Sequence, residues 1–490
     1  MAALLLTMPL EVLLSISYYL PTVDYCNLRQ SCKHIEASLH SSFAKEYFSK
    51  RQFILTEFSL QALVGISNSK FAPYLSHVIL AAERPVWGRP HLTPTVDNTV
   101  EATRRLRMRQ EYASHIGLIS LSQDLELLAE AFGNLPNLQT IGMRDFNSRT
   151  RFRDHPQIEW RSYGANTYYQ HTGLTLTKPD PRTFVHGPPQ LNVDDWARYE
   201  ARLFTGLLQA LGKSGSKPKR VEVILRTVGL FDIAFNTPRF SEPFVGPVLA
   251  HLETLFLDLN EDQVPAMTTS GTNCSYYFLR VFLSKVPALS SLRLNFANSD
   301  HHKTCEFLSW LSSQPTNPIQ GIDTDLSPPP VLLSSLRQLD LGKASISIDV
   351  LTDLVRKYNS LQGLSFYKVS LMGTGTGTNA SSDPARVNLW AKALRHFIKL
   401  DVALTSIRID SVLQDNPPSH QSLPVRFTGD SCSKTWRGKD KVIGLKDLAN
   451  SIVINWPEDN SEVDSEDESM NDDEDSADEI DDDEDGDDDE

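Results

Sequence analysis

The segment "LSSLRQLDLGKASISIDVLTDLVRKYNSLQGLSFYKVSL" at residues 333–371 contains two kinds of apolar pattern. Near its two ends, apolar residues recur at every second position, which is the period of a β-strand with one buried face. Between the ends, "IDVLTDLVRKY" at 348–358 places apolar residues three and four positions apart, which is the period of an amphipathic helix. The segment therefore predicts a strand, a loop, a helix and a second strand, which the aromatic residues Phe366 and Tyr367 close.

The pattern that opens this segment, L-x-x-L-x-L, recurs along the chain. Strict copies start at Leu252, Leu289 and Leu336, and looser copies start at Leu138, Leu361 and Leu404. Such a pattern predicts a short strand whose alternate residues enter a core. The first leucine lies in the segment that leads into the strand, and its side chain also points into the core. Apolar residues at helical spacing between the copies predict helices at 275–286, 348–358 and 384–398.

The spacing of these copies is uneven. From Leu252 onward they begin 25 to 47 residues apart, and one interval falls within about 20–29 residues, the usual length of a leucine-rich repeat. We therefore predict an irregular leucine-rich-repeat-like α/β solenoid with long insertions. An unrelated α/β domain with buried strands is the alternative.

The amino-terminal stretch "MPLEVLLSISYYLPTVDYCNLRQSCKHI" at residues 8–35 predicts short helices. Pro9 suits the first turn of a helix, and Pro21 ends that helix. Thr22 suits the N-cap of a second helix, and apolar residues at helical spacing predict a third helix over 33–48. Because three short helices bury little surface among themselves, apolar surface should remain for the rest of the chain or for a second protein.

This stretch resembles the F-box, the helical module that joins substrate receptors to a Skp-type adaptor in cullin ubiquitin ligases. The positions that match the family pattern are Pro9, Glu11, Val12, Leu13, Ile16, Leu20, Pro21, Asp24, Leu28, Cys32 and Lys33. The sequence departs from the pattern at Met8 and Tyr25, where leucine is usual, and at Ile35, where an aromatic residue is usual. The resemblance implies a Skp-type adaptor, and through it a cullin scaffold, as partners. The adaptor-binding residues that it implies are Met8, Pro9, Val12, Leu13, Ile16, Leu20, Pro21, Leu28 and Cys32.

An amino-terminal F-box followed by a divergent leucine-rich region also resembles the F-box proteins of filamentous fungi. We accordingly predict an α/β chain with a small three-helix F-box, an irregular leucine-rich-repeat-like solenoid and a disordered acidic tail. The predicted regions are an F-box-like module at 1–50, a helical linker at 51–134, the repeat-like domain at 135–456 with an insertion at 147–195, and the tail at 457–490. Within the linker, a helical pattern over 101–132 is interrupted near Gly117.

The acidic tail dominates the net charge of the chain. The chain has 62 acidic and 47 basic residues, and 22 of the acids lie in 458–490, so the remainder has 40 acids and a formal charge of +7. Such dense like charge with almost no apolar residues predicts disorder. Four serines followed three positions later by an acid suit acidophilic kinases of the casein-kinase type: Ser461, Ser465, Ser469 and Ser476. The tail is expected to keep the protein soluble. The alternatives are that it covers the basic body as a lid, or that it attracts basic partners such as histones.

Two other segments are candidates for loops with a function. Residues 149–173 are rich in Arg, Tyr and Trp, and we expect an insertion packed on the solenoid edge in preference to a binding loop. An Arg–aromatic cluster can also touch RNA, but no nucleic-acid motif is present, so we expect no nucleic-acid partner. The glycine-rich stretch at 373–384 lacks the GKS/T ending of a phosphate-binding loop and is predicted to be a linker.

The sequence contains no recognisable catalytic motif. H-E-x-x-H, G-x-S-x-G and kinase-type loops are absent. His301, His302 and Cys305 lie close together, with Cys274 upstream, but they lack the paired spacing of two ligand couplets. We expect Cys305 to face a core and the histidines to lie outside. The predictions are therefore no catalytic residue, no metal, no cofactor and no enzymatic activity.

Cysteine usage and hydropathy bear on the compartment. The five cysteines are dispersed and form no C-x-x-C pair, which favours a reducing compartment. The sequence has no run of 18 apolar residues, so no membrane span is predicted. The first twenty residues lack the early basic residues of a signal peptide. We expect a cytoplasmic or nuclear protein without a membrane partner.

These observations predict a substrate-recognition subunit of a cullin-type ubiquitin ligase. The F-box would bind the adaptor, and the leucine-rich region would bind a protein substrate, which the sequence does not identify. The alternative is an acidic-tailed scaffold or chaperone for basic proteins that is not assembled into a ligase.

Overall fold

The computed structural model has a mixed α/β architecture, with helices at the amino terminus and sheets following. The residues that it describes are 7–86, 99–147, 153–154, 160–178, 193–260, 274–297, 301–315, 328–373, 386–416 and 421–456. The chain divides into two units, Met1–Ile454 and Asn455–Glu490, and nearly all described residues belong to the first. The predicted acidic tail at 457–490 and most of the predicted linker at 373–384 lie outside the described residues.

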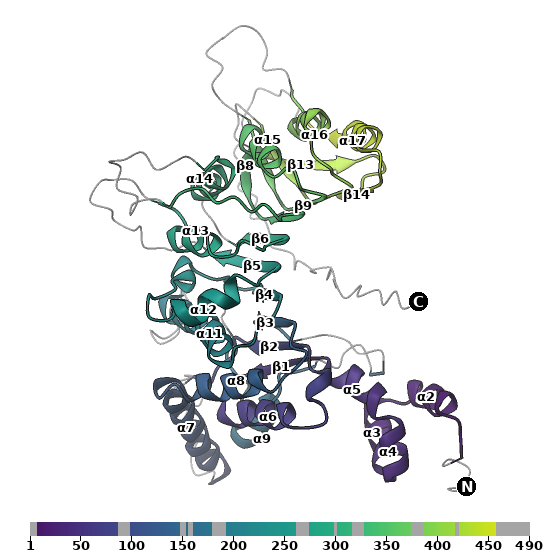
Figure 1. Cartoon of the computed structure of the whole chain (residues 1–490), viewed down its shortest axis with the longest axis vertical. Coiled ribbons are helices and arrows are strands. Elements are labelled where there is room, and N and C mark those ends of the chain that lie inside the picture. The colour runs from purple at the N-terminus through teal and green to yellow at the C-terminus, as the bar shows by residue number, and fades with distance from the viewer. Residues whose placement is uncertain are drawn as a thin grey trace. The chain divides into compact units, whose positions relative to one another are not determined.

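A ten-stranded sheet forms the centre of the first unit (Figure 1). Its strands, in spatial order, are β1 (Lys50–Ile54), β2 (His77–Ala81), β3 (Thr140–Arg144), β4 (Arg220–Ile224), β5 (Thr254–Asn260), β6 (Ser291–Ala297), β7 (Gln338–Gly342), β9 (Gly363–Tyr367), β11 (Ser406–Asp410) and β14 (Ser433–Arg437). The strands from β1 to β11 are parallel and neighbour one another in chain order, and β14 closes the edge in the antiparallel sense.

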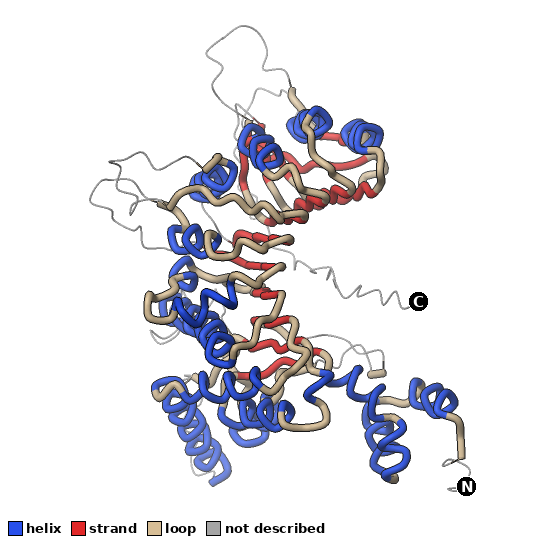
Figure 2. The backbone as a smooth tube through the Cα atoms, in the orientation of Figure 1, coloured by secondary structure: helices blue, strands red, loops and turns tan. Residues whose placement is uncertain are grey.

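Helices lie along one face of this sheet, as Figures 1 and 2 show. They are α6 (Glu57–Ser67), α8 (Gln123–Gly133), α11 (Val193–Ser214), α12 (Glu242–Leu249), α13 (Tyr277–Leu283), α14 (His301–Ser312), α15 (Ile348–Lys357), α16 (Leu389–Lys399) and α17 (Lys441–Asn450). Because parallel neighbours need a crossover, each connection returns the chain past this face. Among the described helices, none is long and apolar enough to cross a membrane.

The alternating pattern explains how each strand packs. In β6, Leu292, Leu294 and Phe296 are buried towards the helices, while the residues between them are half-buried on the other face. This alternation holds over part or all of β5, β7, β9 and β11, whereas the first four residues of β3 are all buried. Together with β6, these are the six strands predicted from L-x-x-L-x-L and its looser copies. Each begins two residues after the first leucine of its motif, and that leucine is buried. The three predicted helices are also confirmed, as α13, α15 and α16.

The prediction of a helical linker at 51–134 is wrong, because this region supplies two strands of the sheet. β1 pairs with β2, and β2 pairs with β3. The segment "LSHVIL" at 75–80 repeats the strand motif with valine in its fourth position, so a pattern restricted to leucine misses it. The helical part is α7 (Thr99–Ser120) and α8, and they are separated at Ser122, whose φ is 57°, instead of at Gly117.

A second, five-stranded sheet accompanies the carboxyl-terminal strands. It consists of β15 (Ile452–Ile454), β13 (Gln421–Phe427), β12 (Leu413–Asn416), β10 (Ser370–Met372) and β8 (Ser345–Ser347), in that order. Three successive units make the same turn between the two sheets, since Lys343, Lys368 and Ser411 each follow a strand of the large sheet with φ near +50°. The repeated turn shows that these units share one backbone design.

Gly229 permits a close approach between the loop after β4 and the end of β5. Its φ is +82°, and an added Cβ would lie 2.9 Å from the carbonyl carbon of Leu259. We expect Gly229→Ala to lower the free energy of unfolding by about 3 kcal/mol in urea denaturation, through backbone strain and steric conflict together. Gly215→Ala is the control, because Gly215 has φ +73° and open space around it, so only strain of about 1 kcal/mol applies. Equal losses for the two variants would refute the steric part.

Candidate functional site

Four short helices form the amino-terminal module: α2 (Leu10–Tyr18), α3 (Thr22–Gln30), α4 (Lys33–Ser38) and α5 (His40–Phe48). Pro9 was expected in the first turn of the first helix and Pro21 at its end; they are the N-cap residues of α2 and α3, respectively. The third predicted helix is two helices, which meet at Leu39. Thr22 was expected to cap α3, but it is the first residue of that helix, and its side chain bonds elsewhere.

The module has a small core of its own. Leu13, Tyr25, Ile35, Leu39 and Tyr47 are buried together. Burial is also the largest influence on the Tyr25 hydroxyl, and it raises the pKa of that group. Leu13 is 1% exposed, so its predicted place among the adaptor contacts is corrected to a place in this core. The physical reason is that α2 has apolar residues on more than one side, and the side that carries Leu13 packs against the other helices of the module.

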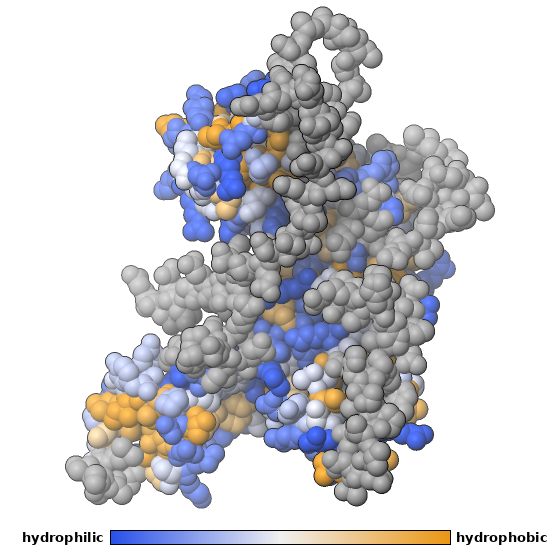
Figure 3. All heavy atoms as spheres, turned by 180° about the vertical axis from the view of Figure 1, so that it is seen from behind, coloured by the Kyte–Doolittle hydropathy of each residue, from blue (hydrophilic) through white to orange (hydrophobic). Residues whose placement is uncertain are grey.

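An exposed apolar face lies beside this core on α2 and the start of α3. Val12 and Ile16 are 43% and 36% exposed, and they are neighbours on the helix surface because they are four residues apart. Tyr19, just after α2, and Val23, at the start of α3, are further exposed apolar residues, with exposures of 81% and 70%. Figure 3 shows apolar residues gathered on the part of the surface that these helices form. We call Val12, Ile16, Tyr19 and Val23 the α2 face.

The structure separates the predicted adaptor-binding residues into three groups. Pro9, Val12, Ile16 and Pro21 are exposed, and Leu13 is buried. The remaining four, Met8, Leu20, Leu28 and Cys32, are half-buried and pack against the module core. Tyr19 and Val23 were missed. Helical spacing was a usable signal for Tyr19, which is three residues from Ile16, but the end of α2 was needed to place it.

Two residues of the predicted insertion bind the module. The Arg153 guanidinium donates to the carbonyl oxygens of Ser17 and Leu20, and its Nε lies 2.5 Å from Oε1 of Glu46. Burial tends to lower the pKa of Arg153, but the hydrogen bond and charge of Glu46 outweigh it, and the pKa is raised. A cation at the carboxyl end of α2 also complements the helix dipole.

Asp154 makes the matching contact at the amino end of α3. Its carboxylate accepts hydrogen bonds from the backbone N–H of Thr22, at 3.2 Å, and from the Thr22 hydroxyl, at 2.7 Å. An anion at this end of a helix is favourable for the same electrostatic reason. Arg153 and Asp154 therefore join the body to the turn between α2 and α3. The expected insertion also packs at the sheet edge, where Tyr163 bridges to Phe53 of β1.

Arg153→Ala should loosen the module. The change leaves two carbonyl oxygens and a carboxylate without their cation, which costs about 2 kcal/mol. Backbone amides of α2 and α3 should then exchange with deuterium about 30-fold faster in hydrogen-exchange mass spectrometry. The control is Arg356→Ala, which removes an exposed ion pair with Asp353 on α15 and should leave this exchange unchanged. Identical exchange in the Arg153 variant and the parent protein would contradict the expected role.

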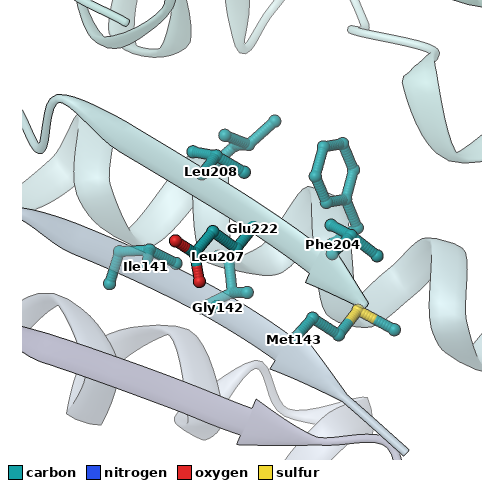
Figure 4. Close-up of a pocket in the computed structure, with 9 residues that line it drawn as sticks. Ile141, Gly142, Met143, Phe204, Leu207, Leu208 and Glu222 are labelled. Carbon is teal, nitrogen blue, oxygen red and sulfur yellow. The ribbon is translucent and has the colours of Figure 1, made fainter. Parts of the chain in front are cut away.

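Two other features of the described residues, an apolar cavity and the histidine–cysteine cluster, do not make a site. Figure 4 shows a cavity between β3, β4 and α11, with Ile141, Met143 and Leu208 in its lining, and it leaves no room for a water molecule. No group of His, Cys, Asp and Glu suited to a metal ion occurs in the part of the chain that the structure describes. Nδ1 of His301 is hydrogen-bonded to the Ser345 hydroxyl. The α2 face is therefore the best candidate.

Comparison with known families bears on this module directly. Residues 5–42 match the family model of the F-box domain. The amino-terminal module is an F-box domain. F-box domains generally bind Skp-type adaptors, so the α2 face belongs to a module with a known kind of partner. The match confirms the predicted F-box and does not extend to the sheet, whose likeness to fungal leucine-rich regions stays a prediction. No curated protein matches the sequence significantly.

Proposed function

We propose that this protein is the substrate-recognition subunit of a cullin-type ubiquitin ligase. The observation that carries the proposal is an F-box domain whose α2 face is exposed. Contiguous exposed apolar residues are typical of surfaces that another protein covers. A Skp-type adaptor would cover this face and connect the chain to a cullin scaffold.

The sheet region is proposed to be a leucine-rich-repeat-like solenoid that binds a protein substrate. Three features support this: parallel strands in chain order, leucine motifs at six of them, and the repeated turn at Lys343, Lys368 and Ser411. Stacked repeats of this kind create extended binding surfaces.

The proposed action is positioning without catalysis. The receptor would hold substrate lysines near the ubiquitin donor and so raise their effective concentration, while separate subunits perform the transfer. No cofactor is required, and a cytoplasmic or nuclear location would suit it. The junction made by Arg153 and Asp154 supports this role, because positioning requires a defined geometry between the F-box and the body.

The test is direct binding between the purified chain and a purified Skp-type adaptor. Isothermal titration calorimetry should show a complex with one adaptor per chain and a negative heat-capacity change, since apolar surface is buried. Immunoprecipitation of the chain from cells should recover a cullin with it. An adaptor that does not bind at concentrations of about 100 μM would refute the proposal.

The composition of the tail favours a second candidate, a scaffold or chaperone for basic proteins. Residues 458–490 contain 22 acidic and no basic residues. Dense acidic charge attracts basic proteins at low ionic strength. Deleting 458–490 should abolish recovery of the main cellular partner if this function is correct, and should leave adaptor binding intact if the ligase function is correct.

A further inference from the structure

The face of the large sheet opposite the helices carries aligned charged and aromatic side chains. The strand register places Glu222, Phe256, Arg293 and Asp340 in one row across β4, β5, β6 and β7. No helix within the described ranges covers this face of β3–β7 (Figures 1 and 2). Exposed basic side chains follow three strands of this sheet: Arg226 after β4, Lys343 after β7 and Lys368 after β9.

The first group on this face holds two arginines against one ring. The guanidinium carbon of Arg226 lies 3.8 Å from the centroid of the Phe146 ring, and that of Arg144 lies 5.3 Å from it. The Asp145 carboxylate accepts hydrogen bonds from the backbone N–H groups of Arg226, at 3.0 Å, and Thr227, at 2.9 Å. Backbone and side chain of Arg226 are thus both held, and the side chain is nevertheless exposed.

The second group repeats this arrangement two strands further along. The guanidinium carbon of Arg293 lies 5.8 Å from the Phe256 ring centroid. Asp258, also on β5, is 8% exposed and accepts a hydrogen bond from the backbone N–H of Leu225 at 2.8 Å. Burial raises the pKa of the Asp258 carboxyl to about 6, and the nearby charges of Arg293 and Lys343 oppose the rise. Asp258 is thus held inside the chain through its hydrogen bond with Leu225, whereas Arg293 is half-buried and Lys343 is exposed.

Two lysines extend the line. Lys343 and Lys368 are exposed, and each donates its backbone N–H to the next unit, to the carbonyl oxygens of Tyr367 and Asp410, respectively. The ammonium of Lys368 lies 5.6 Å from the centroid of the Tyr367 ring. Since adjacent strands are about 4.8 Å apart, the two lysines occupy equivalent places on neighbouring units.

The exposed charges on this face are basic, since Arg226, Lys343 and Lys368 are exposed, whereas Asp145, Asp258 and Glu222 are buried. We call Arg226, Arg293, Lys343 and Lys368, with the rings of Phe146, Phe256 and Tyr367, the basic strip. Its acidic neighbours are engaged within the chain. Asp145 and Asp258 are buried caps of backbone N–H groups, and Asp410 pairs with Arg408 at 3.1 Å. Asp340 accepts a hydrogen bond from the side chain of Gln338.

We infer that the basic strip binds an extended acidic segment of the substrate protein. The inference rests on the proposed function, because it names the class of substrate that the receptor would select. From β3 to β9 the strip crosses five strand intervals, about 24 Å, which an extended chain of about seven residues spans. Guanidinium groups held against aromatic rings keep their donors in a fixed plane, which suits bidentate contact with carboxylates. Phosphoserine offers the same chemistry with more charge.

The test is fluorescence anisotropy with a labelled oligoglutamate of about seven residues and the purified full chain. The variant combines Arg226→Ala, Arg293→Ala and Lys343→Asn, since asparagine tolerates the positive φ of Lys343. We expect it to bind the peptide at least about tenfold more weakly than the parent chain, with a shallower dependence on salt. A phosphoserine-containing peptide should bind the parent chain more tightly and respond to the variant in the same way.

The matched control removes three basic charges from the helix-covered side: Lys392→Ala, Arg395→Ala and Lys446→Ala. These side chains are exposed on α16 and α17. The control variant should bind within about twofold of the parent chain. Equal weakening in both variants would mean that net charge, and not the strip, attracts the peptide, and would overturn the inference. Tighter binding of single-stranded RNA than of either peptide, with the same sensitivity to the strip variant, would also overturn it.

Two further measurements keep the result independent of folding and of the ligase role. Circular dichroism must show equal helix content in all variants, and a charge-keeping variant, Arg226→Lys with Arg293→Lys, should bind with intermediate affinity. If that variant and the parent chain bind the peptide with equal affinity, the proposed bidentate contact between the two guanidinium groups and carboxylates is wrong. The strip variant should still bind the adaptor. Failure of adaptor binding with intact peptide binding would count against the proposed function alone.

Discussion

Replacing Val12 and Ile16 with aspartate should lower the affinity of the chain for a Skp-type adaptor at least about 100-fold. The two side chains lie four residues apart on α2 and are about 40% exposed, so the free protein tolerates a polar replacement at either position. In a complex, each would lose the transfer free energy of an apolar side chain, about 1.5–3 kcal/mol, and a carboxylate would have to be desolvated. A loss of about 2.7 kcal/mol already corresponds to 100-fold in affinity.

The measurement is calorimetric titration of the double variant against the parent chain. The matched control places aspartate at two exposed apolar positions elsewhere, Leu121 and Phe240, which are 73% and 75% exposed. This control should bind the adaptor with unchanged affinity. If the Val12 and Ile16 variant binds as tightly as the parent chain, the α2 face is not the adaptor contact.

Leu13 distinguishes a contact residue from a packing residue. Leu13→Asp would place a carboxylate in the module core, where no partner is available for it, so the F-box itself should unfold. Loss of adaptor binding in this variant would therefore carry no information about the surface. Hydrogen exchange in α2 and α3 separates the two cases, because it should rise for the Leu13 variant and stay at the parent level for Val12→Asp with Ile16→Asp.

The second large effect concerns a buried acid. Glu200, on α11, is fully buried, and neither carboxyl oxygen has a hydrogen-bond partner among the residues that the structure describes. Burial raises the pKa of Glu200 well above its ordinary value; the charge of Asp145 adds to the rise, and that of Arg84 opposes it. The folded protein therefore keeps this carboxyl protonated at pH values where the unfolded chain has released the proton.

The sign of the pH dependence follows from proton binding. Above the unfolded pKa of about 4.3, the folded state binds more protons than the unfolded state, so the free energy of unfolding falls as pH rises. The slope approaches about 1.4 kcal/mol per pH unit while only the unfolded state is ionised. Below pH 4 both states are protonated, and the group contributes no dependence.

Glu200→Gln should therefore stabilise the protein near neutral pH. Glutamine has nearly the same shape and cannot ionise, so the gain should be close to zero at pH 4 and increase towards pH 7, by at most about 1.4 kcal/mol per pH unit. Urea denaturation of the parent chain and the variant across this range measures the difference. The control is Glu130→Gln, the same change at an exposed position on α8, which should show no such trend. A gain that is constant from pH 4 to pH 8 would show that Glu200 does not titrate in the folded state.

Local sequence was enough to place much of the secondary structure and the F-box. Leucines in L-x-x-L-x-L located six strands, because period-two alternation is imposed by the geometry of a strand whatever its neighbours are. The motif did not locate β4. In the six located strands a leucine stands two residues before the strand, whereas before β4 that position is the buried Pro218. β2 was also missed because valine holds the fourth position of its motif, and β1 because Phe48 and Arg51 stand where leucine holds the first and fourth positions elsewhere.

The surfaces that carry function depended on contacts between distant parts of the chain. Periodicity showed that Val12, Leu13 and Ile16 are apolar residues of one helix, but α3, α4 and α5 decide that Leu13 alone of the three is covered. Arg153 lies more than a hundred residues from the carbonyl groups that it binds. The basic strip likewise exists only because parallel pairing brings strands from distant parts of the chain about 4.8 Å apart. Spacing along a chain dictates which side chains share a face, whereas the burial or exposure of that face is set by whatever packs against it, and local spacing carries no record of that.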